Sequence, residues 1–79
     1  MNLSYEMVTS SGARYGVYDE RKTYTHVTHY VGPFELEESA KIYADEYTEA
    51  WQMGYNGSAR PIFIDDKWYA YCSRWTSCD

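Results

Sequence analysis

Alternating apolar and polar positions predict a series of short strands. In residues 3–9, Leu3, Tyr5 and Met7 fall on one side of the chain, which is the period of a half-buried strand. Residues 23–31 are rich in Thr, Tyr and Val, which suit a pleated surface. The predicted strands span residues 3–9, 14–18, 23–31, 60–64 and 67–74.

Turn-forming residues separate these strands. Gly12 closes a Ser-Ser-Gly turn, where glycine adopts positive φ without steric cost. The charged residues 19–22 predict a polar turn, and Gly16 marks a bulge in the short strand before it. The pair Asp65-Asp66 predicts a hairpin between the last two strands.

Residues 33–54 carry the one long helical pattern of the chain. Gly32 and Pro33 are expected to stop the sheet, because proline cannot donate to a strand ladder and suits the first turn of a helix. Gly54 is expected to end the helix, with a further turn at Asn56-Gly57. The helix stripe expected to pack on the sheet contains Leu36, Ala40, Tyr43, Ala44, Tyr47, Ala50 and Trp51.

These elements predict one α+β domain over residues 1–79, in the order β-β-β-α-β-β. An antiparallel sheet of about five strands would carry one amphipathic helix on one face. The chain has ten Tyr, three Trp and two Phe, which is more aromatic area than a small core can hide. Several rings are therefore expected at the surface, where they either reflect a small interior or form a contact surface.

The charge of the chain is concentrated on the predicted helix. Six of the twelve acidic residues lie within residues 33–54, against the single base Lys41, so this segment accounts for the whole formal charge of −5. Glu37 and two neighbouring glutamates lie near the helix start, where the helix dipole favours negative charge. The remaining acidic and basic residues of the chain balance each other.

The helix face opposite the packing stripe is the candidate binding site. The hypothesis is that it binds a partner protein. Two apolar side chains lie among its carboxylates, as scattered surface hydrophobes or as desolvated contacts for a partner. Like charges four residues apart cost a few tenths of a kcal/mol, so stability alone does not favour this pattern. The candidate partner-binding residues are Glu35, Glu38, Ile42, Asp45, Glu46, Glu49 and Met53.

Composition argues against several other functions. The acidic balance disfavours direct nucleic-acid binding, which needs a basic surface. The chain has no apolar run long enough to span a membrane and no signal-peptide pattern, so we expect a cytosolic protein. His26, His29, Cys72 and Cys78 lack zinc-site spacing, and no catalytic motif is present, so we expect no metal, no cofactor and no enzymatic activity.

One further surface is predicted on the third strand. Tyr24, His26, Thr28 and Tyr30 alternate onto one face of it. Aromatic sheet faces stack bases of single-stranded RNA, but the few basic residues favour a half-exposed face or a homodimer contact instead. A small structural or regulatory homodimer, pairing through a sheet edge or this face, is therefore the alternative hypothesis.

In its layout the chain resembles the small inhibitor proteins of phages and mobile elements, of the anti-CRISPR and anti-restriction type. The resemblance lies in the short sheet, the acidic helix FELEESAKIYADEYTEAW and the closing hairpin PIFIDDKWYAYCSRW. It implies a protein that inhibits a nucleic-acid-handling complex of the host, in the bacterial cytosol if phage-encoded. The acidic helix would then bind a basic surface of that complex.

Overall fold

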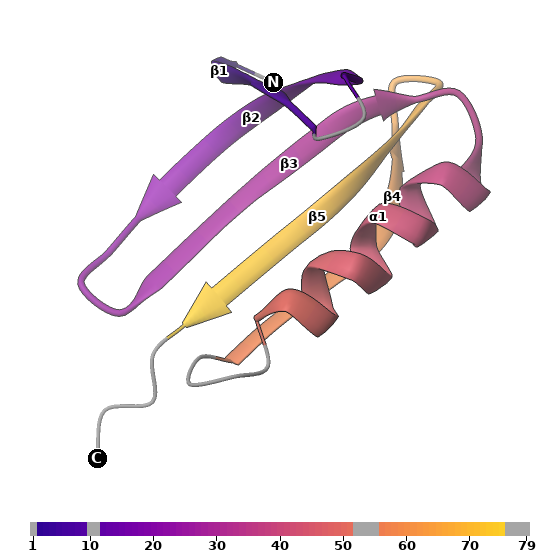
Figure 1. Cartoon of the computed structure of the whole chain (residues 1–79). Helices are drawn as coiled ribbons and strands as arrows, with labels where there is room; N and C mark the ends of the chain where they lie inside the picture. The colour runs from indigo at the N-terminus through magenta and orange to yellow at the C-terminus, as the bar shows by residue number, and fades with distance from the viewer. Residues whose placement is uncertain (1, 10–11, 52–55, 76–79) are drawn as a thin grey trace.

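Five strands and one helix make up the computed structural model, which describes residues 2–9, 12–51 and 56–75. The elements are β1 (Leu3–Val8), β2 (Arg14–Lys22), β3 (His26–Phe34), α1 (Glu37–Ala50), β4 (Asn56–Ile64) and β5 (Lys67–Trp75). All the strand pairs are antiparallel, and the strands lie side by side in the order β1-β2-β3-β5-β4. The predicted α+β class and element order are confirmed (Figure 1).

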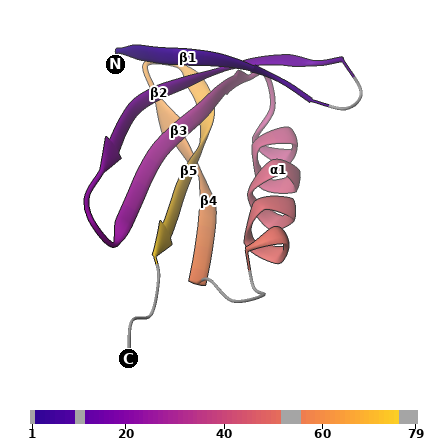
Figure 2. The ribbon, with the colours of Figure 1, turned by 60° about the vertical axis from the view of Figure 1, so that its left-hand side comes forward.

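The helix covers one face of the sheet, mainly over β4 and β5 (Figure 2). Ala40 and Ala44 are fully buried there, and their small side chains allow the helix backbone to approach the strands. Both belong to the core, which consists of Val17, Val31, Phe34, Ala40, Ala44, Ala70 and Cys72. The first strands of the sheet extend beyond the helix, so the core is open toward β1 and β2.

The helix spans Glu37–Ala50 rather than residues 33–54, and Gly54, which was expected to end it, lies outside the described residues. The strand β3 continues through the cis peptide Gly32–Pro33 to Phe34, because a register shift between Val31 and Phe34 accommodates the proline. The helix therefore begins later than expected, at Glu37. Leu36 is its N-cap and is 62% exposed, and Ala50 is also exposed, so neither belongs to the packed stripe.

The expected polar turn at residues 19–22 is instead the end of β2. Asp19 has a φ of 50°, and the register between β2 and β3 shifts between Tyr18 and Arg21. The bulge therefore lies at Asp19, and Gly16 sits within regular pairing with Gly32. The sequence pattern did not predict that residues 19–22 belong to β2. Four consecutive charged residues are typical of a turn, and their pairing with β3 is not visible in the sequence.

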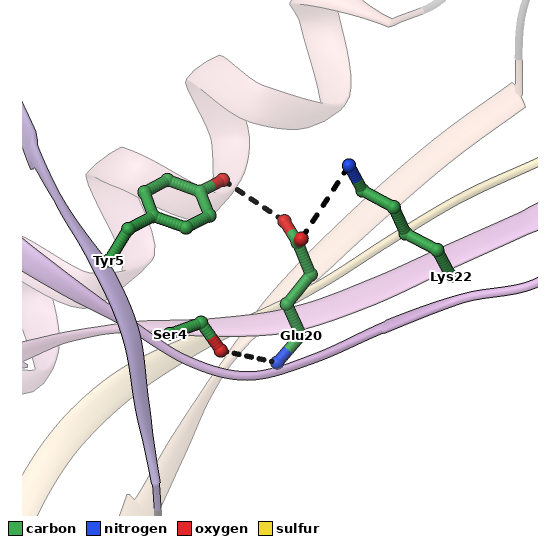
Figure 3. A network of polar contacts seen from close by, with 4 residues as sticks. All are labelled: Ser4, Tyr5, Glu20 and Lys22. Carbon is green, nitrogen blue, oxygen red and sulfur yellow. Dashed lines mark hydrogen bonds and ion pairs between the residues drawn. The ribbon is translucent and has the colours of Figure 1, made fainter.

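Side chains of β1 and β2 hold this irregular segment in place (Figure 3). The Tyr5 hydroxyl donates to Glu20 Oε2 at 3.1 Å, and the Glu20 amide donates to Ser4 Oγ at 3.1 Å. Lys22 Nζ lies 3.6 Å from Glu20 Oε1. Glu20 thereby ties the edge strand to its neighbour.

The hairpin prediction at Asp65-Asp66 is confirmed, and both residues have positive φ (51° and 63°). Gly12 also has positive φ, at 87°, as expected. The expected turn at Asn56-Gly57 was wrong, because both residues begin β4 and pair with β5. The third strand begins at His26 rather than Thr23, because the Thr23 amide bonds to the His26 carbonyl at 2.8 Å in a turn.

Candidate protein-binding surface

The predicted binding residues of the helix share one exposed face of α1. Counted from Glu38, the other four members lie four, seven, eight and eleven positions further along the helix. This spacing places all five within an arc of about 100° around the helix axis. Every one of them is exposed, and Ile42 has 53% of its surface accessible. We call this set the acidic strip, and it consists of Glu38, Ile42, Asp45, Glu46 and Glu49.

Two predicted members lie elsewhere. Glu35 was expected on the helix, but it is exposed in the bend that joins β3 to α1. Met53 lies outside the described residues. The helix itself carries five acids and Lys41, so it holds a formal charge of −4, and the remaining unit of the predicted −5 comes from the bend.

The carboxylates of the acidic strip have no charged partner within the part of the chain that the structure describes. The ion pair that the described residues form joins Lys22 to Glu20, on another element. Among the described residues, no base lies within salt-bridge distance of Asp45 or of Glu49 one helical turn later. The negative charge of this face is therefore available to a binding partner.

A groove runs beside the acidic strip, between α1 and the sheet. Ile42 and Glu46 form its helix side, so the strip and the groove share these two residues. Its volume is about 380 Å³. The residues that line it are Thr9, Tyr15, Phe34, Ser39, Ile42, Tyr43 and Glu46. The groove exists because α1 lies over β4 and β5 and leaves β2 uncovered on this side.

Three rings contact one another in this groove. Tyr15 and Phe34 have centroids 4.7 Å apart, Phe34 and Tyr43 are 5.8 Å apart, and Tyr15 and Tyr43 are 6.2 Å apart. The Tyr43 hydroxyl donates to Met7 Sδ at 3.6 Å. Burial raises the pKa of Tyr43 to about 12, so this phenol stays neutral at physiological pH. The groove thus offers an aromatic wall beside carboxylates.

Sequence reasoning missed most of this groove. Tyr43 was expected in the core, and Tyr15 and Phe34 were not assigned to any site. The alternation in residues 14–18 does place Tyr15 on the same side as the buried Val17, which is the one signal available. The long reach of β3, which brings Phe34 under α1, left no such signal.

Leu36 adds an apolar side chain at the other end of the helix. It was expected in the core, but it lines a shallow hollow with Glu37, Glu38 and Lys41. The hollow lies at the first turn of α1, next to the first residue of the acidic strip. Exposed apolar residues therefore accompany the carboxylates along the helix.

His29 and the buried Cys72 are cross-strand neighbours on the helix side of the sheet, away from His26. His29 is buried on the helix side of β3, with its ring 5.7 Å from that of Tyr47, whereas His26 is exposed and contacts Ser73 Oγ at 2.9 Å. The two histidines thus point to opposite faces of β3. Burial raises the pKa of the Cys72 thiol to about 12, which makes it a poor nucleophile.

No three His, Cys, Asp or Glu side chains among residues 2–9, 12–51 and 56–75 lie close enough together to hold a metal ion. Within the same residues, no helix has the length and hydrophobicity needed to cross a membrane. Comparison with protein-family models, with curated proteins and with solved structures found no match for this chain.

Proposed function

We propose that this protein is a non-enzymatic binding module that inhibits a nucleic-acid-handling complex by occupying a basic surface of it. The observation that carries the proposal is the acidic strip beside the aromatic groove. Its carboxylates are exposed and form no ion pair with a described residue. Surfaces that bind nucleic acids are basic, so an acidic helix competes for them without any chemical step.

The two parts of the surface would contribute differently to binding. The carboxylates, Asp45 and Glu49 among them, would steer association with a basic partner. Ile42 and the rings of Tyr15 and Tyr43 would supply desolvated contact area once the partner is bound. Exposed carboxylates contribute little to the stability of the fold. Their placement along an apolar groove is therefore better explained by binding to a partner than by folding.

A basic side chain of the partner fits the groove by its chemistry. The methylene stem of an Arg or Lys packs against aromatic rings, and its charged head reaches a carboxylate. Glu46 lies on the same groove as the rings of Tyr15 and Tyr43. This arrangement supports a basic protein partner over a neutral one.

Affinity capture from bacterial lysate tests the proposal, with the washes repeated at low and high salt. We expect a basic nucleic-acid-binding protein at low salt and its loss at high salt. The test variant carries Asp45→Asn, Glu46→Gln and Glu49→Gln. The matched control, Glu6→Gln, Glu37→Gln and Asp66→Asn, makes the same change in net charge outside the acidic strip.

The test variant should lose the partner and the control should keep it. Equal loss in both variants would show that net charge alone is responsible and would rule out the strip. Recovery of no basic partner under any salt condition would count against the inhibitor function itself.

The alternative function is a homodimer that pairs through a sheet edge. One contact restricts which edge strand could form that dimer. The Ala59 amide of the edge strand β4 donates to Thr48 Oγ1 of the helix at 3.1 Å. That amide is then not free to pair with a second copy, because the helix covers this part of the edge. Light scattering over a range of concentrations separates a monomer from a dimer that pairs through β1.

A further inference from the structure

The sheet has a second face, turned away from α1, which we call the outer face (Figures 1 and 2). Residues directly opposite each other on neighbouring strands share a face, and faces alternate along a strand. The pairs His29–Cys72 and Val31–Ala70 are buried on the helix side. The pairs between and beside them therefore point to the outer face.

Strand register assembles two rows of side chains across β2, β3, β5 and β4 on the outer face. The first row, which we call the aromatic row, consists of Tyr18, Tyr30, Tyr71 and Arg60. The second, the hydroxyl row, consists of Arg21, Thr28, Ser73 and Ser58. The rows are adjacent, and each has an arginine at one end, on opposite edges of this part of the sheet.

Within the aromatic row, Tyr71 contacts both Tyr30 and Arg60, whereas the Tyr18 ring packs against Tyr69, with centroids 5.8 Å apart. Tyr30 and Tyr71 have centroids 4.9 Å apart with an interplanar angle of 45°. The Arg60 guanidinium carbon lies 5.8 Å from the Tyr71 centroid, within cation–π range. Tyr30 and Tyr71 are both only partly buried, so ring surface remains accessible to a ligand.

Two hollows lie on either side of Tyr71. One, of about 340 Å³, is lined by Asp19, Arg21, Thr28, Tyr30 and Tyr71. The other, of about 400 Å³, is lined by Ser58, Ala59, Arg60, Tyr71 and Ser73. Each hollow thus combines the Tyr71 ring with one arginine and with hydroxyl groups that donate or accept hydrogen bonds.

The charge of this face is opposite to that of the helix. The two rows contain two arginines and no carboxylate. Asp19 lines the hollow of Arg21, so the rows and Asp19 together carry a formal charge of 2 − 1 = +1. Neither Arg21 nor Arg60 forms an ion pair with a described residue. The acidic strip lies on the far side of both sheet and helix, beyond the Debye length of about 8 Å at physiological salt, so it repels an anion on the outer face only weakly.

We propose that the outer face binds single-stranded nucleic acid, with bases stacked on Tyr30 and Tyr71 and phosphates bound by Arg21 and Arg60. Accessible rings suit planar bases of any sequence, and unpaired arginines suit phosphodiesters. Comparable four-stranded faces stack two or three bases. Arg21 and Arg60 lie on strands three spacings apart, about 14 Å, which matches a site of that size.

This site is independent of the proposed inhibitor function, because it uses the opposite face of the sheet. It also revises the expectation that the chain makes no direct contact with nucleic acid. That expectation came from net charge, and net charge does not report how the bases are distributed between faces. Arg21 and Arg60 are 39 positions apart in the chain, and strand pairing alone brings them onto one surface.

Fluorescence anisotropy with labelled oligo(dT) and oligo(U), each compared with a DNA duplex, tests the site on the full chain. We expect saturable binding of the single strands that weakens with salt, and weaker binding of the duplex. The variant Arg21→Ala with Arg60→Ala should bind at least tenfold more weakly and show a shallower salt dependence, because two phosphate contacts are lost. The control, Lys41→Ala with Lys67→Ala, removes two charges outside both rows and should bind as the wild type does.

Tyrosine variants separate stacking from charge. Tyr71→Ala should weaken binding roughly tenfold to a hundredfold, whereas Tyr71→Phe keeps the ring and should bind nearly as well as the wild type. Circular dichroism melts establish that the variants are folded. No saturable binding of either oligonucleotide overturns the proposal, as does duplex binding of equal strength or equal loss in the lysine control. Self-association that Tyr71→Ala abolishes would assign the face to a homodimer instead, and would also overturn it.

Discussion

Thr48 joins the helix to the edge strand through its hydroxyl, which accepts a hydrogen bond from the Ala59 amide at 3.1 Å. The same hydroxyl donates to the Ala44 carbonyl one helical turn earlier, at 2.9 Å. Ala59 pairs with Cys72 on β5, and no strand among the described residues lies on the other side of β4. A helix side chain therefore satisfies an amide that the sheet leaves open.

Thr48→Val should destabilise the fold by about 1–3 kcal/mol, because the half-buried Ala59 amide loses its partner while the side-chain volume is kept. Thr48→Ser retains the hydroxyl and should cost much less. Urea denaturation of both variants measures the difference. Equal stability of Thr48→Val and the wild type would show that the bond does not hold α1 to β4.

Gly57→Ala should also destabilise the fold, through a contact at the end of the helix. A Cβ at Gly57 would lie 2.5 Å from Trp51 Cβ, an atom fixed by the backbone, so the end of the helix would have to move. We expect a loss of about 1–3 kcal/mol, typical of overpacking. Ser58→Ala, at the exposed neighbouring position, is the control and should melt as the wild type does.

The acidic strip makes a kinetic prediction for the captured partner. Asp45→Lys or Glu49→Lys should mainly slow association and alter its salt dependence, because steering depends on charge. Ile42→Ala should mainly speed dissociation, because an apolar contact is lost from the bound state. Surface plasmon resonance at two salt concentrations separates the rates. If both kinds of substitution changed the same rate constant, the assignment of association to the carboxylates and of dissociation to Ile42 would be contradicted.

The two faces of α1 should respond oppositely in stability. Ile42 is 53% exposed, so Ile42→Ala should change the melting temperature little. Tyr47 packs against His29 and Trp51, with ring centroids 5.7 Å and 6.2 Å away, and Tyr47→Ala should cost about 3–5 kcal/mol. If Ile42→Ala unfolded the protein and Tyr47→Ala did not, the orientation of the helix would be wrong.

Because His29 is buried, we expect the folded protein to lose stability in mild acid. Burial lowers the pKa of His29, Arg74 lowers it further, and Glu20 partly opposes both. The unfolded chain, with a histidine pKa of about 6.5, therefore takes up a proton before the folded chain does. Below that pH protonation lowers the free energy of the unfolded state relative to the native state, so stability falls as the pH falls.

Denaturation of wild type and His29→Gln between neutral pH and pH 5 measures this contribution. The difference in unfolding free energy between them should change with pH, because only the wild type carries this buried titrating group. His26→Gln, on the opposite and exposed face, is the control for replacing a histidine, and the effect of His29→Gln is compared with it at each pH. A pH-independent difference for His29→Gln would show that His29 does not titrate differently on folding.

Part of the candidate site was predictable from local pattern. Exposure of Ile42, Asp45 and Glu49 follows from helical period alone, because a helix places residues three, four and seven positions apart on one side. The groove beside them was not predictable in this way. Its rings come from Tyr15 on β2, Phe34 at the end of β3 and a helix residue, and nothing in their spacing relates them.

The sequence by itself determined the order of the elements, the hairpin at Asp65-Asp66 and the packing of Ala40 and Ala44 on the sheet. Each of these depends on residues within one or two turns or strands, where periodicity and turn preferences act. Only the tertiary structure decided where strands end, because pairing across β2 and β3 extended both beyond the residues that favour strands. Pairing also decided that Arg21 and Arg60 share one face, since register between distant strands is set by the whole sheet.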